Sequence, residues 1–345
     1  MKVLVARLDS DGDVLLAGPA IRAVAAAGDT EVTLLCGQAG EQAAHLLPGV
    51  DHVLVWHCPW IAADPDPVST QDIQELVGRT RGFDVAVVLT SAHQSALPLA
   101  LVLRLAGVPR IAGISTDYPG SLLDIRMRPD IDFTDDAPEP LRALTVAAAA
   151  GFRLPDGDDG RLRIRPTPDV THLTGDEPYV VLHPGATVPA RRWPAERCAD
   201  AVRALADAGH RVLVTGGPGE KDLTAEVAGD AGVDLGGATD FAELAGVLRG
   251  ADAVVVGNTG PAHLAAAVGT PVVSLFAPVV PAIRWAPHGV PTVLLGDQAA
   301  PCRGTRARVC PVPGHPCLTS ITAADVVSAV HTFHTTRGHD TCASR

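Results

Sequence analysis

Residues 253–278 read AVVVGNTGPAHLAAAVGTPVVSLFAP, and this segment is the most informative about the fold. The short apolar run 253–256 is typical of a buried parallel strand, and it ends at the polar turn 257–261. The alanine-rich stretch 263–268 predicts a helix, and a second apolar run at 272–276 predicts the next strand. A strand, a tight turn, a helix and a strand in 26 residues indicate an open parallel sheet covered by helices.

The turn in this stretch is typical of a ligand site. Asn258 and Thr259 follow the carboxyl end of a strand and precede the amino end of a helix. At such a place free backbone N–H groups and the positive end of the helix dipole favour an anionic ligand such as a diphosphate.

The same alternation of strands and helices runs through the rest of the chain in two halves. It stops near residue 152, crosses a stretch rich in Pro, Gly and Asp, and restarts near residue 179. We therefore predict an α/β protein with two doubly wound, Rossmann-like domains and a ligand cleft between them, at the carboxyl ends of the strands. The predicted parts are an N-terminal domain (1–160), a linker (161–176), a C-terminal domain (177–320) and a C-terminal segment (321–345) whose helix folds back on the first domain.

Strands are expected at 3–7, 31–35, 52–55, 84–89, 110–114, 179–183 and 211–215, besides the two named above. Helices are expected at 18–27, 95–106, 195–208, 221–229, 241–249 and 323–335.

Charge and hydropathy exclude several classes of protein. The chain has 345 residues, 39 acidic and 27 basic, and a net charge of −12. No basic stripe is present that could bind nucleic acid, and no run reaches the ~18 apolar residues of a membrane span. The apolar N-terminal stretch is short and leads into three aspartates, so we interpret it as a first β-strand rather than a signal peptide and expect a cytoplasmic protein.

Cys302, Cys310 and Cys317 cluster late in the sequence, but they lack the paired C-x2-C spacing of structural zinc sites. Free thiols are the favoured interpretation. Zinc stays open as an alternative, because His315 would complete a set of four ligands.

The first predicted strand ends in Asp9, Asp11 and Asp13. This D-x-D-x-D pattern begins a calcium loop, but Val14 and Ala20 stand where that loop needs glycine and a bidentate glutamate. Two interpretations of Asp13 remain open. A tight turn at Gly12 would leave its carboxylate free to take a proton from an attacking hydroxyl, or it would cap the first helix.

In the second half, Arg191 and Arg192 precede a predicted helix, where positive charge opposes the helix dipole unless an anion binds. A solvated loop is the alternative, and it is favoured more for Arg191 than for Arg192. Glu220, after a glycine-rich turn, is suited either to ribose hydroxyls or to the start of a helix. His263 shares a turn with the expected phosphate site. Trp193 is expected to be a packing anchor.

Four ordered segments of this chain resemble glycosyltransferase family 9, the family of the ADP-heptose:lipopolysaccharide heptosyltransferases. They are followed by a similar cysteine segment, CRGTRARVCPVPGHPCL, and a terminal helix. The four segments are KVLVARLDSDGDVLLAGPAIRAV, VVLHPGATVPARRWP, VLVTGGPGEKD and VVVGNTGPAHLAAAVGTPVVSLFAP.

The resemblance implies a GT-B fold, two Rossmann-like domains facing each other across a cleft, with the acceptor on the first and the nucleotide-sugar on the second. It also implies an inverting, metal-independent transfer from an ADP-activated sugar, expected to be heptose, to a cell-envelope glycan or a small soluble acceptor. At the matching positions, Asp13 would be the general base. Asp11, Gly12 and His93 are the candidates on the acceptor side. The donor would contact Thr187, Arg192, Glu220, Asn258, Thr259, Gly260 and His263.

Three residues depart from the family's usual pattern: Arg192 stands where lysine is common, Asn258 where aspartate is common, and Asp11 where a neutral residue is usual. The first half is also acidic, at −8, which fits poorly with docking on an anionic membrane. Partners other than the donor and the acceptor are not expected, apart from peripheral membrane contact. The alternatives are a nucleotide-sugar epimerase or hydrolase on the same frame, and a catalytically silent nucleotide-sugar-binding protein.

Overall fold

The computed structural model describes residues 1–62, 65–91 and 93–340. They form two compact units, Met1–Arg165 and Pro166–Arg345, of which residues 341–345 lie outside the described part. The division falls inside the expected linker 161–176. Among the described residues, no helix is long and apolar enough to cross a membrane.

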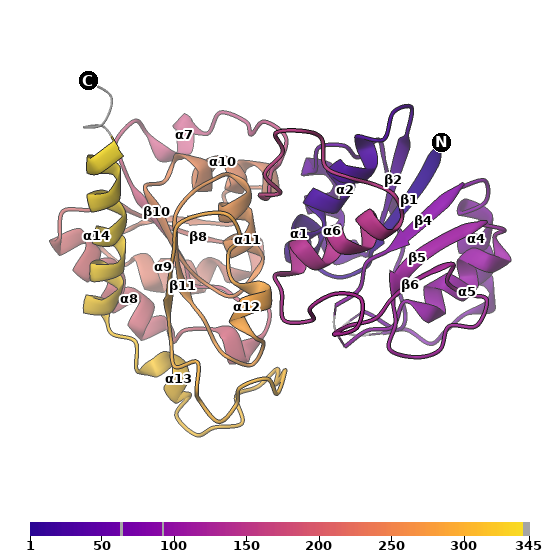
Figure 1. Ribbon diagram of the computed structural model, residues 1–345. Coiled ribbons are helices and arrows are strands. Elements are labelled where there is room, and N and C mark those ends of the chain that lie inside the picture. Colours follow the sequence, from indigo (N-terminus) through magenta and orange to yellow (C-terminus); the bar gives the residue numbers. More distant parts are fainter. Residues whose placement is uncertain (63–64, 92, 341–345) are drawn as a thin grey trace. The chain divides into compact units, whose positions relative to one another are not determined.

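The first unit is built on a parallel sheet with the strand order β3-β2-β1-β4-β5-β6 (Figure 1). Its strands are β1 (Lys2–Arg7), β2 (Glu31–Cys36), β3 (His52–Val55), β4 (Val85–Val88), β5 (Arg110–Ile114) and β6 (Ile125–Met127). Its helices are α1 (Asp11–Leu16), α2 (Gly18–Ala25), α3 (Glu41–Leu46), α4 (Thr70–Arg79), α5 (Leu97–Leu105) and α6 (Glu139–Ala149).

The central strands of this unit are apolar because both faces of the sheet are covered. Val3, Leu4 and Val5 of β1 have no exposed surface, as expected of a strand between two helical layers. Chain order and sheet order reverse between β1 and β4, which makes the carboxyl ends of these two strands the topological switch point, the usual ligand site of such sheets.

The second unit repeats this topology. Its sheet has the order β12-β11-β10-β7-β8-β9, so the reversal falls between β7 and β10. The strands are β7 (Val180–His183), β8 (Val212–Gly216), β9 (Val233–Gly236), β10 (Ala253–Gly257), β11 (Val272–Leu275) and β12 (Thr292–Leu295). The helices are α7 (Thr171–Thr174), α8 (Ala195–Asp207), α9 (Lys221–Ala228), α10 (Phe241–Gly250), α11 (Gly260–Ala267), α12 (Ala282–Trp285), α13 (Pro316–Thr319) and α14 (Ala323–Asp340).

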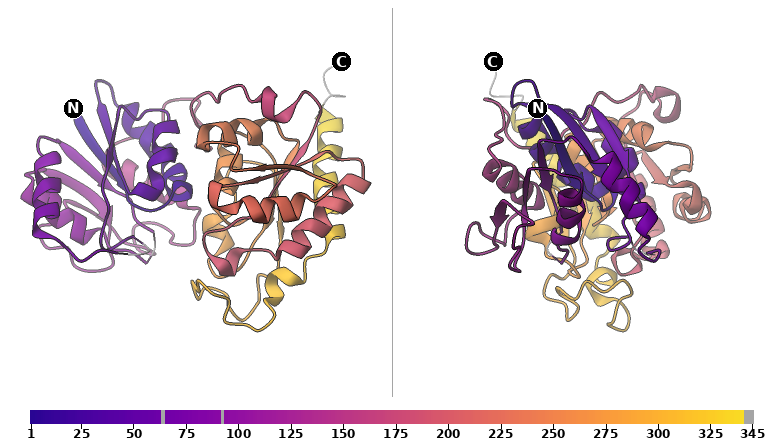
Figure 2. Two further views of the ribbon diagram at one scale, coloured as in Figure 1. Left: turned by 180° about the vertical axis from the view of Figure 1, so that it is seen from behind. Right: turned by 90° about the vertical axis from the view of Figure 1, so that its right-hand side faces the viewer.

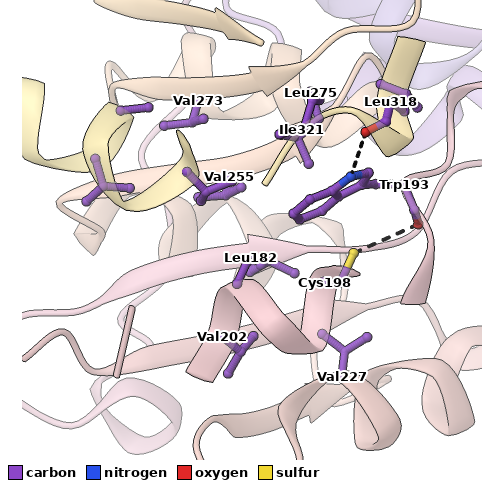
Figure 3. Packing of buried hydrophobic residues seen from close by; sticks show 14 of the residues in the cluster. Leu182, Trp193, Cys198, Val202, Val227, Val255, Val273, Leu275, Leu318 and Ile321 are labelled. Carbon is purple, nitrogen blue, oxygen red and sulfur yellow. Dashed lines mark hydrogen bonds between the residues drawn. The ribbon is translucent and has the colours of Figure 1, made fainter. Parts of the chain in front are cut away.

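The core of the second unit is closed by a tryptophan and by the last helix. Trp193 is 2% exposed and donates its indole N–H to the carbonyl of Leu318 at 3.0 Å, as the close-up in Figure 3 shows. Helix α14, expected to return to the first domain, packs here against α8, β10 and β11; it is the yellow helix in Figures 1 and 2.

Candidate functional site

In the first unit, Asp13 is held at the switch point by a buried arginine. Arg7 ends β1, is 3% exposed, and lies with its Nη2 2.7 Å from Asp13 Oδ1. Ser10 Oγ donates to Asp13 Oδ2 at 3.1 Å, and Arg7 Nη2 also donates to Ser91 Oγ after β4 at 2.8 Å. The carboxylate is therefore tied to both strands that flank the switch point, and its orientation is fixed.

Arg7 serves more than one acid. Its Nε lies 2.9 Å from Asp9 Oδ2, and its Nη1 lies 3.8 Å from Glu139 Oε2. These carboxylates raise the pKa of Arg7, although burial acts in the opposite direction and is the largest influence. Gln94 donates to Asp9, and Glu139 in turn faces Arg142 at 3.3 Å. The result is a connected ion network of low exposure around one guanidinium.

Burial raises the pKa of Asp9 to about 6. Arg7 and the Gln94 hydrogen bond oppose this shift, and the neighbouring Asp13 adds to it. Burial also raises the pKa of Asp11 to about 6, while a hydrogen bond from the backbone N–H of Ala43, 2.9 Å away, lowers it. Both acids lie where an added negative charge is costly.

The expected tight turn at Gly12 is wrong. Gly12 is the second residue of α1 and has a buried, helical backbone. Asp13 follows within the first turn, and its carboxylate accepts hydrogen bonds from the side chains of Arg7 and Ser10. Asp11 holds the backbone of α3 through Ala43, whereas His93 is exposed after β4, next to Gln94.

In the second unit, the loop after β7 and the turn after β10 meet at the other switch point. Thr187 and Arg192 are exposed, and Arg192 Nη2 donates to the carbonyl of Ala186 at 2.8 Å. Arg191 Nη1 donates to the carbonyl of Asn258 at 3.4 Å. The arginine expected to be the more solvated, Arg191, is thus the one that contacts the turn after β10.

Asn258 is a brace between two strands. It is 3% exposed; its Nδ2 donates to the carbonyl of Ala277, and the Ala277 N–H donates back to its Oδ1, both at 3.3 Å. Thr259 then stands at the N-cap of α11 with an extended backbone, and Gly260 begins the helix. His263 is 5% exposed in the first turn. Of these four residues, Thr259 and Gly260 are the more accessible.

Glu220 is seated against glycines. A Cβ atom at Gly185 would lie 2.6 Å from Glu220 Oε2, which overlaps the carboxylate. Glu220 Oε2 accepts the N–H of Gly217 at 2.9 Å, and Glu220 is the N-cap of α9. The buried His183, hydrogen-bonded to Thr215 Oγ1 at 3.0 Å, has a lowered pKa because of burial, although Glu220 acts against it. The carboxylate thus faces the end of β7.

The cysteine segment, residues 302–318, packs against the loop after β7. Cys302 and Cys317 are 1% exposed, and the pKa of Cys317 is raised to about 12, first by burial and then by Cys302, to which it is hydrogen-bonded. His315 Nε2 lies 3.0 Å from the carbonyl of Ala190. Within residues 1–62, 65–91 and 93–340, no group of three or more His, Cys, Asp or Glu side chains is arranged to hold a metal ion.

Residues 74–314 match glycosyltransferase family 9 (heptosyltransferase). The chain belongs to this family. The resemblance found in the sequence is therefore confirmed, and the two parallel sheets correspond to the expected GT-B fold.

This chain is similar in sequence to several lipopolysaccharide heptosyltransferases. It is 31% identical over 171 residues to lipopolysaccharide heptosyltransferase 3 of Escherichia coli, a match that covers 47% of this chain and 48% of that protein. It is 30% identical over 220 residues to lipopolysaccharide heptosyltransferase 1 of Pseudomonas aeruginosa, covering 61% and 60%. These matches span about half to three fifths of the length of the curated relatives.

Among solved structures, E. coli ADP-heptose lps heptosyltransferase II has a TM-score of 0.73 at 18% identity. That match covers 98% of this chain and all of the other chain. At this level of identity the likeness shows a shared fold.

Proposed function

We propose that this family 9 protein is an inverting, metal-independent glycosyltransferase that moves heptose from ADP-heptose to an acceptor hydroxyl. The observation that carries the proposal is the pair of switch points. One presents a carboxylate, Asp13, held 2.7 Å from Arg7. The other presents an exposed Arg192 on the loop that Arg191 joins to the turn before α11. The first suits a base, and the second suits a leaving diphosphate. The E. coli structural relative is an ADP-heptose lps heptosyltransferase, which supports the choice of donor.

In the proposed reaction, Asp13 accepts the proton of the acceptor hydroxyl while that oxygen bonds to the anomeric carbon of heptose. The bond from this carbon to the diphosphate oxygen breaks, and ADP leaves with the bonding electrons. A single displacement inverts the configuration at the anomeric carbon. The fixed orientation of the carboxylate matters because a general base must lie within hydrogen-bond reach of the proton it takes.

Charge on the leaving diphosphate needs a partner. The guanidinium of Arg192, the N–H of Gly260 and the positive end of the α11 dipole supply fixed positive charge of the kind that stabilises such a transition state. We assign Thr187 and Thr259 to the phosphates and Glu220 to the ribose hydroxyls. Asn258 and His263 are buried, so we assign them to holding this site in place rather than to direct contact with the donor.

The decisive experiment compares D13N with wild type in transfer from ADP-heptose and in ADP binding. We expect transfer to fall at least about 100-fold, the contribution typical of a general base, with unchanged affinity for ADP. D29N, a change at an exposed acid of the same unit, should leave both unchanged. Full turnover by D13N would contradict the mechanism.

The donor is tested separately by thermal shift. ADP should stabilise the protein, whereas UDP, GDP and dTDP should not, and a chelator should leave turnover unchanged. A preference for UDP would overturn the donor assignment. Consumption of ADP-heptose without acceptor, at the rate of transfer, would favour the epimerase or hydrolase alternative.

A further inference from the structure

A cavity of about 210 Å³ opens in the first unit, apart from the Asp13 network. It lies between the segment that follows β3 and helix α4. Its lining includes Trp56, His57, Asp66, Asp72, Glu75 and Arg79. The volume is below the roughly 300–1,000 Å³ of sites that take a whole drug-sized ligand, so it suits one ring of a larger molecule.

The cavity combines an apolar base with an acidic rim. Trp56 and Leu76 are 9% and 0% exposed, and Trp56 is fixed by edge contact with Trp60, their ring centroids 5.2 Å apart. Asp72, Glu75 and Arg79 follow one another along one face of α4 at helical spacing. An aromatic base with carboxylates above it can receive a ring that carries ammonium groups, through ion pairs and cation–π contact.

The charges around the cavity favour a cation over an anion. The lining has three carboxylates, those of Asp66, Asp72 and Glu75, and one arginine, Arg79. Arg79 Nη1 lies 4.0 Å from Glu75 Oε1, and it donates a hydrogen bond to the carbonyl of Val55 at 3.2 Å. His57 lies 3.7 Å from Asp66. The whole unit to which the cavity belongs has a formal charge of −8 over residues 1–165. A phosphorylated acceptor would be repelled here.

The register of the sheet places the segment that follows β3, which forms one wall of the cavity, at the same edge as the residues that lead to the proposed base. Val55 of β3 pairs with Cys36 of β2, and Cys36 pairs with Arg7 of β1. Trp56 and the residues after Arg7 therefore leave the sheet at the same edge, two strand spacings apart, which is about 10 Å. Because α4 packs on the face of the sheet opposite to α1, an acceptor that fills the cavity has to be longer than one ring and cross this edge to offer a hydroxyl to Asp13.

We propose that this cavity is an acceptor subsite that binds an amino-bearing ring, an aminosugar or aminocyclitol, of the sugar acceptor. The proposal rests on the transferase function proposed above, and it specifies the class of acceptor. Asp72 and Glu75 bind the ammonium groups, and Trp56 packs against the ring.

The test measures binding in the absence of donor, by saturation-transfer NMR and calorimetry at neutral pH. The probes are the diaminocyclitol 2-deoxystreptamine, its N,N′-diacetyl derivative and neutral myo-inositol. We expect the diamine to bind wild type and the two neutral compounds to bind at least about fivefold more weakly. In D72N/E75Q, affinity for the diamine should fall about five- to tenfold, which corresponds to one or two weak ion contacts. E75Q alone should give part of this loss, and it leaves the first turn of α4 unchanged.

The matched control is E226Q/D230N, which removes two exposed acids from the second unit and should bind the diamine as wild type does. Equal binding of all three probes, or diamine binding that D72N/E75Q does not weaken, would overturn the subsite. ADP binding, measured on the same samples, separates the two proposals. If ADP binds while the diamine does not, the subsite is wrong and the transferase proposal stands. If the diamine binds while ADP does not, the donor assignment is wrong, and the cavity is an amine-binding site without the acceptor role.

Discussion

The two units share one topology, but their switch points are built in opposite ways. Around Asp13, buried side chains hold one another through ion pairs, with Arg7 3% exposed at the centre. In the second unit, Thr187 and Arg192 are exposed, and the loop that carries them is held through backbone hydrogen bonds and glycine contacts. A group that must keep one orientation is thus fixed by ion pairs, whereas the groups proposed to bind a charged ligand are accessible on a loop whose backbone is held in place.

Removal of Arg7 is the strongest way to break this contrast. R7M leaves Asp9, Asp13 and Glu139 without their shared cation. We expect a loss of about 3–5 kcal/mol in the free energy of unfolding, as for other broken buried ion pairs, together with loss of transfer. Urea denaturation followed by circular dichroism measures the first. R203M, at an exposed arginine paired with Asp200, should cost less than about 1 kcal/mol, and an equally small effect of R7M would contradict the network.

Gly185 tests the glycine contacts of the second unit. In G185A the new methyl group displaces the Glu220 carboxylate from its place beside Gly217. We expect ADP affinity to fall about tenfold, or ~1.4 kcal/mol, in isothermal calorimetry. Gly219 has open space around it, so G219A is the control and should bind ADP normally. Unchanged affinity in G185A would remove Glu220 from the donor site.

The Asn258 brace predicts an effect of similar size, on folding rather than on ADP binding. In N258D an ionised carboxylate cannot donate to the Ala277 carbonyl, which Asn258 Nδ2 reaches at 3.3 Å. The free energy of unfolding should fall by about 1–3 kcal/mol at pH 7, and the deficit should shrink at pH 4, where a protonated carboxyl donates again. A deficit that does not depend on pH would indicate that the amide is not the reason for asparagine here.

The smallest expected effect is the pH dependence linked to Asp11. Its pKa is raised to about 6 from an ordinary 3.8, so the folded protein binds more protons than the unfolded one between these values. The stability from this group is present below about pH 4 and is lost as the pH rises through about 6. D11N, which keeps an acceptor for the Ala43 N–H, should flatten the profile by about 1 kcal/mol, allowing for partial exposure. A profile identical to that of wild type would contradict the shift.

Much of the fold could be predicted from the sequence, because the central strands are covered on both faces and are therefore short, uninterrupted apolar runs. The inner strand β5 agrees with its predicted bounds, and so does the edge strand β3. The edge strands β6, β9 and β12 were missed. The sequences of β6 (IRM) and β9 (VDLG) have no continuous apolar run, whereas β12 (TVLL) has one of only three residues and is half-buried. An edge strand is paired on one side only, and its sequence carries less information.

The candidate site was harder to predict in detail. Asp13 and the turn after β10 follow strands and could be found by position. Arg7 could not be assigned a partner, because Ser91 and Glu139 are 84 and 132 residues away from it in the chain. A charged residue at the end of an otherwise apolar strand was the available signal. Whether an arginine or an asparagine serves the ligand or the backbone is decided by tertiary contacts, as Arg191 and Asn258 illustrate.

The attachment of the cysteine segment to the loop after β7 has a consequence for protein engineering. Three hydrogen bonds join them: Ala190 N–H to the Arg308 carbonyl, His315 Nε2 to the Ala190 carbonyl, and the Trp193 indole to the Leu318 carbonyl. A graft that exchanges residues 184–193 for those of another transferase would leave these bonds unmatched. Residues 302–318 should therefore be transplanted with them, as one cassette drawn from a single parent.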